Sequence, residues 1–343
     1  MAVLLLALTA LPAGAQFERL VDEIEWKRLD LRPRPALLRE RGVRVYGRLD
    51  LAAIRTGGRN WLGHPDVPSY LGVQGDQPVG GGWRMRFEFE QGFDATSEPG
   101  TAAGTQAPAS DCGAWFDRAC WLQLEHASGA SVVAGRYLQP AYQVAALADP
   151  WLGAGGATAQ PLRYPAPHEG GRPPRIRSSQ ALTLRSPDWE GHRVEVMRTH
   201  PDPDRPGPEV GAAWRYERGA WVLGAGWQRW DAGHDALPVS AAVRLGWWRL
   251  HLGATWGHHA GRRYHGSVLG LVSEGRSGAR PLRWRFSVAE GRLDGERRRG
   301  KLALGAEKPL GRNVLLYGNA AWSRQPQTGG WTVELGLRQE FSL

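Results

Sequence analysis

Lysine, isoleucine and cysteine are scarce in this 343-residue sequence, and no long apolar run follows its first dozen residues. A helix that spans a bilayer needs about 20 consecutive apolar residues, so an ordinary helical membrane protein is excluded. Isoleucine occurs only at Ile24, Ile54 and Ile176, although a soluble chain of this length usually holds two domains with aliphatic cores. The 46 glycines and 17 tryptophans are instead typical of many short strands joined by tight turns.

Arginine carries almost all of the positive charge. The 43 basic residues include lysine only at Lys27, Lys301 and Lys308, and the formal net charge is +9. An arginine surplus can indicate nucleic-acid binding. Here, however, the arginines recur at alternate positions along predicted strands, which spreads them around a wall and disfavours a single basic groove.

The N-terminus indicates export. Residues 3–12 are apolar and precede an Ala-Gly-Ala sequence, which predicts a secretory signal peptide over residues 1–15 with cleavage after Ala15. Residues 16–42 place apolar side chains at helical spacing and then contain prolines, so they are predicted to form a periplasmic extension with a short amphipathic helix plus linker. A weakly ordered tail is the alternative, because an isolated helix of this length is marginal in water.

The only two cysteines, Cys112 and Cys120, are close together in the sequence. In an oxidising compartment a local disulfide between them is a reasonable hypothesis. Two unpaired thiols are an equally good interpretation at this stage, because disulfide geometry cannot be judged from spacing.

From residue 43 onward, apolar and polar side chains alternate. In residues 83–90, for example, Trp, Met, Phe and Phe alternate with Arg, Arg, Glu and Glu, which is the pattern of strands with one apolar face. The sequence predicts about sixteen such strands, in the barrel domain 43–343. They are 43–54, 69–75, 83–93, 118–127, 131–138, 179–186, 192–199, 209–217, 220–230, 238–246, 248–257, 264–273, 280–290, 299–308, 313–323 and 330–341.

Two features favour a transmembrane antiparallel β-barrel over a soluble sandwich. Short Gly/Pro-rich linkers alternate with longer ones, as expected of periplasmic turns and outer loops. Tryptophans also gather at strand ends, where an outer-membrane barrel has its aromatic girdles; they are Trp221, Trp227, Trp230, Trp247, Trp248, Trp256, Trp322 and Trp331. Because every backbone group in lipid must be paired, the sheet must close, and a barrel of this size leaves an aqueous lumen.

Four segments resemble the trimeric general diffusion porins of Gram-negative bacteria, proteobacterial type. They are residues 45–52, 69–93 and 120–151 and the C-terminal LGLRQEF. The resemblance implies a homotrimeric channel in the outer membrane, in contact with outer-membrane lipid and lipopolysaccharide, that passes small hydrophilic solutes and needs no cofactor. Two departures stand out: Ser342 and Leu343 follow the terminal aromatic residue, and residues 16–42 have no counterpart in the family.

The same resemblance implies that the third loop folds into the lumen and narrows it. The long linker 140–178 is this loop, and Asp149 falls where the family has an acidic loop residue. The matching basic wall positions are Arg48, Arg118 and Arg185. Alternation turns Arg48 and Arg185 inward. Alternation along the strand directs the Arg118 side chain outward, whereas the resemblance places it inside.

Charge on the lumen wall predicts selectivity independently of the resemblance, because rings of arginine favour anions. The inward positions hold more arginines than acids, where the acids counted are Asp50, Glu88, Glu90, Glu334 and Glu340. The additional inward arginines are Arg44, Arg84, Arg86, Arg215, Arg244, Arg249, Arg283, Arg285 and Arg338. The ensemble predicts an anion preference, although any single arginine outside the constriction can instead lie in a solvated rim or pair with an acid.

No phosphate-binding loop, metal-ligand spacing or dinucleotide fingerprint is present, and the chain is not expected to be an enzyme. His258, His259 and His265 fall in a predicted outer loop; a solvated loop tip is favoured over a metal site there. The leading function is therefore passive diffusion through a porin. The alternatives are a substrate-specific channel for phosphate or carboxylates and a non-channel barrel such as an adhesin.

Overall fold

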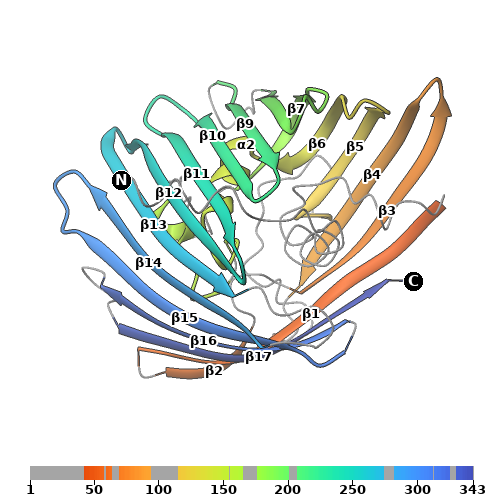
Figure 1. Ribbon diagram of the computed structural model, residues 1–343. Helices are drawn as coiled ribbons and strands as arrows, with labels where there is room; N and C mark the ends of the chain where they lie inside the picture. Colours follow the sequence, from red (N-terminus) through yellow and green to blue (C-terminus); the bar gives the residue numbers. More distant parts are fainter. Residues whose placement is uncertain are drawn as a thin grey trace.

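The computed structural model describes residues 42–57, 59–63, 69–93, 115–153, 155–164, 176–200, 207–273, 282–311, 313–324 and 330–342. These residues form one antiparallel sheet that curls round into a barrel (Figure 1). The predicted signal peptide and nearly all of the predicted extension lie outside the described residues.

The strands are β1 (Gly42–Thr56), β2 (Arg59–Gly63), β3 (Ser69–Gly80), β4 (Trp83–Phe93), β5 (Ala119–His126), β6 (Ser131–Leu138), β7 (Arg177–Arg185), β8 (His192–Thr199), β9 (Val210–Arg218), β10 (Trp221–Arg229), β11 (Asp235–Leu245), β12 (Trp248–His259), β13 (Arg262–Ser273), β14 (Arg283–Leu293), β15 (Arg299–Pro309), β16 (Val314–Arg324) and β17 (Gly330–Ser342). The short strand β2 and the strand β3 share one position beside β1, because β2 pairs with its second half and β3 with its first. The barrel therefore has 16 strand positions.

All sixteen predicted strands are confirmed, and within the described ranges β2 is the one strand that alternation did not predict. Closure is made between the first and last strands, whose register runs from Tyr46 opposite Ser342 to Thr56 opposite Thr332. A closed sheet leaves no unpaired edge, which is what a lipid environment requires. The prediction of a closed barrel is therefore confirmed.

The two ends of the barrel differ. Short turns such as 81–82, 219–220 and 246–247 lie at the same end as residues 42 and 342, and we call this the turn end. The opposite end, where the long connections lie, is called the loop end. One loop-end connection is unexpectedly tight. Strands β12 and β13 are joined by Ala260 and Gly261 alone, both with positive φ.

This tight hairpin corrects the prediction of an outer loop around the histidines. His258 and His259 end β12, and His265 lies within β13. Among the described residues no group of three or more His, Cys, Asp or Glu side chains is arranged to hold a metal ion. Likewise, no described helix is both long and apolar enough to cross a membrane.

The outer face of the barrel is apolar. In β1 the outward Leu49 and Leu51 are 39% and 46% exposed, whereas the inward Asp50 and Arg48 are buried. A soluble protein would reverse this arrangement, so the exposed leucines and valines indicate a surface that faces lipid. The interior, by contrast, is lined by polar and charged side chains.

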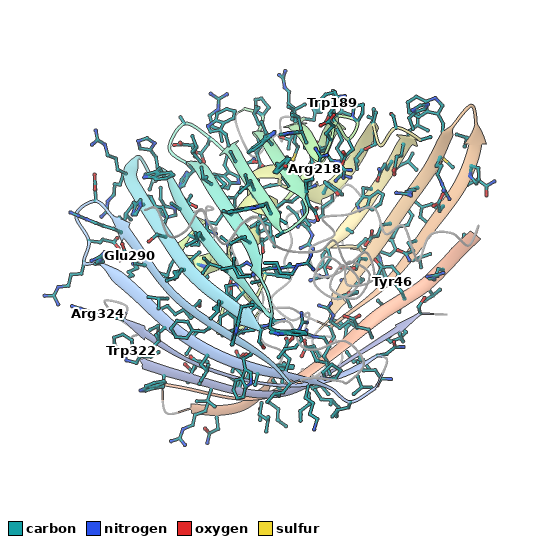
Figure 2. All side chains as sticks on the ribbon, in the orientation of Figure 1. Tyr46, Trp189, Arg218, Glu290, Trp322 and Arg324 are labelled. Carbon is teal, nitrogen blue, oxygen red and sulfur yellow. The ribbon has the colours of Figure 1, made fainter. Side chains whose placement is uncertain are left out.

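Tryptophans form two bands on the outer face. The turn-end band contains Trp83, Trp189, Trp221, Trp247, Trp248 and Trp284, and the loop-end band contains Trp227, Trp256, Trp322 and Trp331. Figure 2 shows Trp322 and Trp189 on opposite sides of the molecule, with their side chains directed outward. The predicted girdles are therefore present. Trp230 is the exception, because it is 4% exposed and lies inside the barrel.

A buried network joins the strands at the closure. Tyr317 Oη on β16 donates to Asp50 Oδ1 at 2.6 Å, and Arg338 Nε on β17 donates to Asp50 Oδ2 at 2.7 Å. The ring of Tyr317 also covers Gly336, where a Cβ would collide with it. The carboxylate of Asp50 therefore bridges three neighbouring strands on the lumen side.

Candidate functional site

The third loop lies inside the barrel, as predicted, and begins with the helix α2 (Pro140–Leu147). Figure 1 shows this helix behind β9, within the ring of strands. Pro140 occupies the first helical turn, where a missing N–H costs nothing. Every residue of α2 is buried. The helix approaches the wall closely at Gly226 of β10, where an added Cβ would lie 2.9 Å from Ala141 Cα.

An aromatic chain fastens the helix to the wall. The rings of Tyr142 and Tyr164 have centroids 5.5 Å apart, and those of Tyr164 and Trp230 are 5.2 Å apart, both edge to face. Trp230 was predicted to belong to a girdle; the structure instead places it in this inner core. A tryptophan at the end of a strand can belong either to an outer girdle or to the inner core, so sequence position alone did not distinguish the two roles.

The second half of the loop crosses to the far strands. Trp151 Nε1 donates to Asn319 Oδ1 on β16 at 2.9 Å, and the Gly156 amide donates to Glu334 Oε1 on β17 at 2.7 Å. Lys301 Nζ on β15 donates to the Thr158 carbonyl at 2.8 Å. The loop is thus tied to the wall from β8, where Gln143 donates to Glu195, round to β17. The inner faces of β1, β3 and β4 lie on the other side of the lumen.

Asp149 organises this loop from within. Its side chain is buried, and its carboxylate accepts hydrogen bonds from the amides of Trp151 (3.0 Å), Gly153 (3.2 Å) and Ala159 (3.2 Å) and from the Thr158 hydroxyl. The resemblance implied an acid facing the pore. In the structure, the backbone amides of the loop itself surround the carboxylate.

Arg163, which the sequence analysis did not single out, is the second internal anchor. It is 1% exposed, and its guanidinium donates to the Ala145 carbonyl near the end of α2 and to Ser240 Oγ at 3.5 Å. Burial lowers the pKa of Arg163 to about 10. It sits beside Gly253 of β12, where a Cβ would meet the guanidinium. The pairing of a wall glycine with a loop arginine is visible only in three dimensions.

On the side of the lumen opposite α2, two of the three predicted wall arginines come together. The Cζ atoms of Arg48 and Arg118 lie 5.1 Å and 4.8 Å from the centroid of the Tyr70 ring. Arg118 also donates to Glu90, so it faces the lumen. Its residue precedes the first residue of β5, and strand parity therefore does not apply to it. Cation–π contact with Tyr70 holds the two like charges apart in a fixed geometry.

Arg185, the third predicted wall arginine, lies apart from this pair. Its Nε donates to Glu195 Oε2 at 2.7 Å, and its guanidinium also contacts the Tyr137 hydroxyl. Glu195 in turn accepts a bond from Gln143 of α2 at 3.0 Å. The structure therefore connects Arg185 to the third loop and does not bring it to Arg48.

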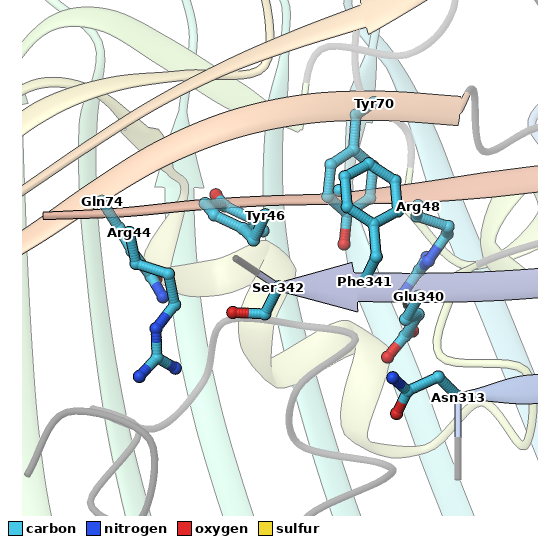
Figure 3. Close-up of a pocket in the computed structure, with 10 residues that line it drawn as sticks. Arg44, Tyr46, Arg48, Tyr70, Gln74, Asn313, Glu340, Phe341 and Ser342 are labelled. Carbon is cyan, nitrogen blue, oxygen red and sulfur yellow. Dashed lines mark hydrogen bonds and ion pairs between the residues drawn. The ribbon is translucent and has the colours of Figure 1, made fainter. Parts of the chain in front are cut away.

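A small cavity of about 130 Å³ opens beside Arg48 at the turn end (Figure 3). Arg48 Nη2 donates to Glu340 Oε1 at 2.9 Å, so the arginine that lines this cavity is neutralised in part. Arg44 lines the other side of the cavity, next to Gln74. Both predicted arginines of β1 therefore lie on the lumen face near the closure.

The other predicted lumen arginines face inward, and several have acidic partners on neighbouring strands. The pairs are Arg84–Asp76 (2.9 Å), Arg86–Asp76 (3.5 Å), Arg86–Glu125 (2.5 Å), Arg283–Glu307 (4.0 Å), Arg285–Glu307 (2.6 Å) and Arg338–Asp50 (2.7 Å). At these positions the arginines pair with acids across strands, which is the alternative that the sequence left open for single arginines.

Four partner acids were missed in the sequence analysis. Asp76 lies one residue beyond the predicted end of its strand. Glu125, Glu195 and Glu307 lie within predicted strands at inward positions. The alternation that identified the inward arginines would have identified these acids as well, so the lumen is less basic than the arginines alone suggested.

Arginines of neighbouring strands stand directly opposite one another at the turn end. The register pairs Arg193 with Arg215 and Arg244 with Arg249. All four are half-buried on the lumen face, and Arg193 also lies 3.4 Å from Asp188. Like charges directly opposite destabilise a sheet. Their presence here concentrates positive charge on one part of the lumen wall, and it includes the predicted Arg215 and Arg249.

Cys120 forms a disulfide bond. Its predicted partner Cys112 lies outside the described residues. Cys120 is the second residue of β5 and has the same strand parity as Leu122, so the bond lies close to the start of this strand.

A closed antiparallel barrel with an apolar outer face, two tryptophan bands and a charged interior defines a β-barrel channel of the outer membrane. Residues 2–328 match the family model of Gram-negative porins. The chain belongs to this family, and the predicted family and location are confirmed. No curated protein matches the sequence.

Solved structures share the fold at low sequence identity. An anion-selective porin from Comamonas acidovorans is 19% identical, with 88% of this chain and 100% of that chain covered and a TM-score of 0.69. OmpF of Salmonella typhi in complex with daunomycin is 13% identical, with 88% and 97% covered and a TM-score of 0.65. A loop L8 deletion mutant of OmpT, an outer membrane protein of Vibrio cholerae, is 10% identical, with 88% and 99% covered and a TM-score of 0.60.

Proposed function

We propose that this porin is a passive, anion-preferring diffusion channel for small hydrophilic solutes and that it catalyses no reaction. The observation that carries the anion preference is the pairing of Arg193 with Arg215 and of Arg244 with Arg249 on the lumen face. Charge on a narrow, low-dielectric wall concentrates counter-ions. The anion-selective porin from Comamonas acidovorans, which shares this fold, supports the same proposal.

Recording from the purified porin in a planar bilayer tests this function. We expect ohmic steps in potassium chloride, a reversal potential in a salt gradient that reports chloride preference, and conductance that rises with salt without saturation. Conductance that saturates with phosphate or a carboxylate alone would favour the substrate-specific channel. The absence of ohmic steps, or a cation preference, would contradict the proposal.

We further propose that the channel is a homotrimer in contact with outer-membrane lipid and lipopolysaccharide, exported by a signal peptide over 1–15 and preceded by the extension 16–42. An aromatic patch on the outer face supports association: Phe89 lies 5.4 Å from Phe87 and 5.3 Å from Phe116 between ring centroids.

Alanine at Phe87 and Phe89 together is expected to convert trimers into monomers in mild detergent. Light scattering measures the mass. Trimers of unchanged stability would place the interface elsewhere, and Leu302→Ala/Leu304→Ala on β15 is the matched control.

A further inference from the structure

A second, larger cavity lies on the wall at the loop end of β12, β13 and β14. Its volume is about 510 Å³. Its lining includes Trp256, His258, Arg263, His265, Arg292 and Asp294. Trp256 belongs to the loop-end tryptophan band and is 48% exposed, while the preceding Thr255 is buried. The alternation along the strands therefore directs these side chains away from the lumen, towards the membrane interface.

The strand register brings the cationic and imidazole groups of this cavity side by side. His265 stands opposite both Trp256 and Arg292, and His258 stands opposite Arg263. The rings of Trp256 and His265 have centroids 5.8 Å apart. One side of the cavity is therefore aromatic and the other carries two guanidinium groups.

The two arginines differ from those that line the lumen. Arg263 and Arg292 are exposed, and within the part of the chain that the structure describes neither guanidinium has an ion pair or hydrogen bond. His258 is already engaged, since its Nδ1 lies 2.7 Å from Asp235 Oδ1. Asp294 adds one carboxylate to the cavity, so its lining retains a positive balance.

The distribution of outward-facing positive charge also distinguishes the two ends of the barrel. At the turn end the outward basic residues of the described strands are Lys308 and Arg218, and Arg218 pairs with Glu190 at 3.2 Å. At the loop end the exposed outward arginines besides the two in the cavity are Arg55, Arg198, Arg229 and Arg324. Figure 2 shows Arg324 extending outward next to Trp322.

From these observations we propose that the cavity binds the phosphate-bearing headgroup of an anionic glycolipid in the outer leaflet of the outer membrane. This proposal rests on the assigned orientation, in which the turn end is periplasmic and the loop end faces outward. Arginine binds phosphate oxygens through two parallel hydrogen bonds, and charged side chains are tolerated at the interface but not at the bilayer centre. The Trp256 ring supplies an apolar surface beside the headgroup.

The geometry divides the work between the residues of the cavity. Arg263 and Arg292 bind phosphate, and His265 lies between Arg292 and the tryptophan as a further hydrogen-bonding group. The remaining loop-end arginines contribute a general attraction to anionic lipid. The cavity is distinguished from that general attraction by its shape and by its two neighbouring guanidinium groups.

The test uses the full-length porin in detergent with bisphosphorylated lipid A as the probe, and native mass spectrometry counts the bound lipid. Arg263→Glu/Arg292→Glu is expected to weaken binding about tenfold or more, because two attractive contacts become repulsive. The matched control Arg55→Glu/Arg198→Glu makes the same charge change on the same rim outside the cavity and is expected to weaken binding less than about threefold. Arg263→Lys/Arg292→Lys should fall between wild type and the glutamate variant, since lysine keeps the charge but loses the paired bonds.

Two further arms identify the ligand. Dephosphorylated lipid A should bind the wild type no more tightly than it binds Arg263→Glu/Arg292→Glu. Inorganic phosphate at the same concentration should not displace the phosphorylated lipid. Equal losses in the cavity and control variants would overturn the proposal in favour of diffuse attraction, and displacement by inorganic phosphate would indicate a site for free anions. Single-channel conductance should be unchanged in both variants, so a failure here is distinguishable from a failure of the diffusion function.

Discussion

Asp149→Ala is expected to raise single-channel conductance and current noise, because it removes the acceptor that holds the third loop in shape. The buried carboxylate accepts hydrogen bonds from the amides of Trp151, Gly153 and Ala159 and from the Thr158 hydroxyl. A buried donor left without an acceptor costs about 1–3 kcal/mol. The loss of several such bonds at one point should therefore release this segment from the wall while the barrel itself stays folded.

Bilayer recording and liposome swelling with sugars of increasing size measure this effect. Conductance should rise by about half or more, and larger sugars should enter the liposomes. Asp188→Ala is the matched control, since Asp188 also accepts an amide hydrogen bond, from Gly191 at 2.8 Å, but lies in an exposed turn. It should leave conductance at the wild-type value. Unchanged conductance in Asp149→Ala, with the barrel still resistant to unfolding in detergent, would show that the loop does not narrow the pore.

Arg48→Glu is expected to move the channel from anion towards cation preference. The change replaces a positive charge by a negative one next to Glu340, which Arg48 Nη2 now contacts at 2.9 Å, and beside Tyr70, which it shares with Arg118. Charge in a narrow aqueous passage acts strongly on permeant ions because the surrounding wall screens it poorly. We expect the chloride-to-potassium permeability ratio to fall severalfold.

Three companion variants make this prediction specific. Glu340→Gln should change the ratio in the opposite direction, because it leaves the charge of Arg48 uncompensated. Arg262→Glu is the control, since Arg262 pairs with Glu296 at the loop end, away from Arg48. Equal shifts in Arg48→Glu and Arg262→Glu would mean that the constriction is misplaced. A larger shift in Arg249→Glu than in Arg48→Glu would show that the opposed arginines contribute more to the anion preference than Arg48 does.

The predicted strands were reliable because alternation reports directly on a wall with lipid on one side and water on the other. Arg48 and Arg185 face the lumen as their parity required. The same rule failed for Arg118, because this residue precedes its strand and its side chain turns inward to Glu90. The short strand β2 was missed because it is only five residues long and shares with β3 the position beside β1.

The site was harder to predict than the fold, because its geometry depends on contacts between distant segments. Asp149 was placed in the correct loop, but sequence position did not reveal that its carboxylate is enclosed by the loop's own amides. Trp230 resembles a girdle residue by its place at a strand end, yet it packs on Tyr164 inside the barrel. Arg163 gave no signal, since its role depends on Gly253 and on the end of α2.

The sequence by itself determined the barrel, its strands and the direction in which most of their side chains point. These properties follow from a local period of two and from the requirement that every backbone group in lipid be paired. Only the tertiary structure decided which inward charges neutralise each other, because an ion pair depends on the register between neighbouring strands. It also decided where the third loop is fastened, through the packing of α2 against β10 and the bonds that Trp151 and Gly156 make to β16 and β17.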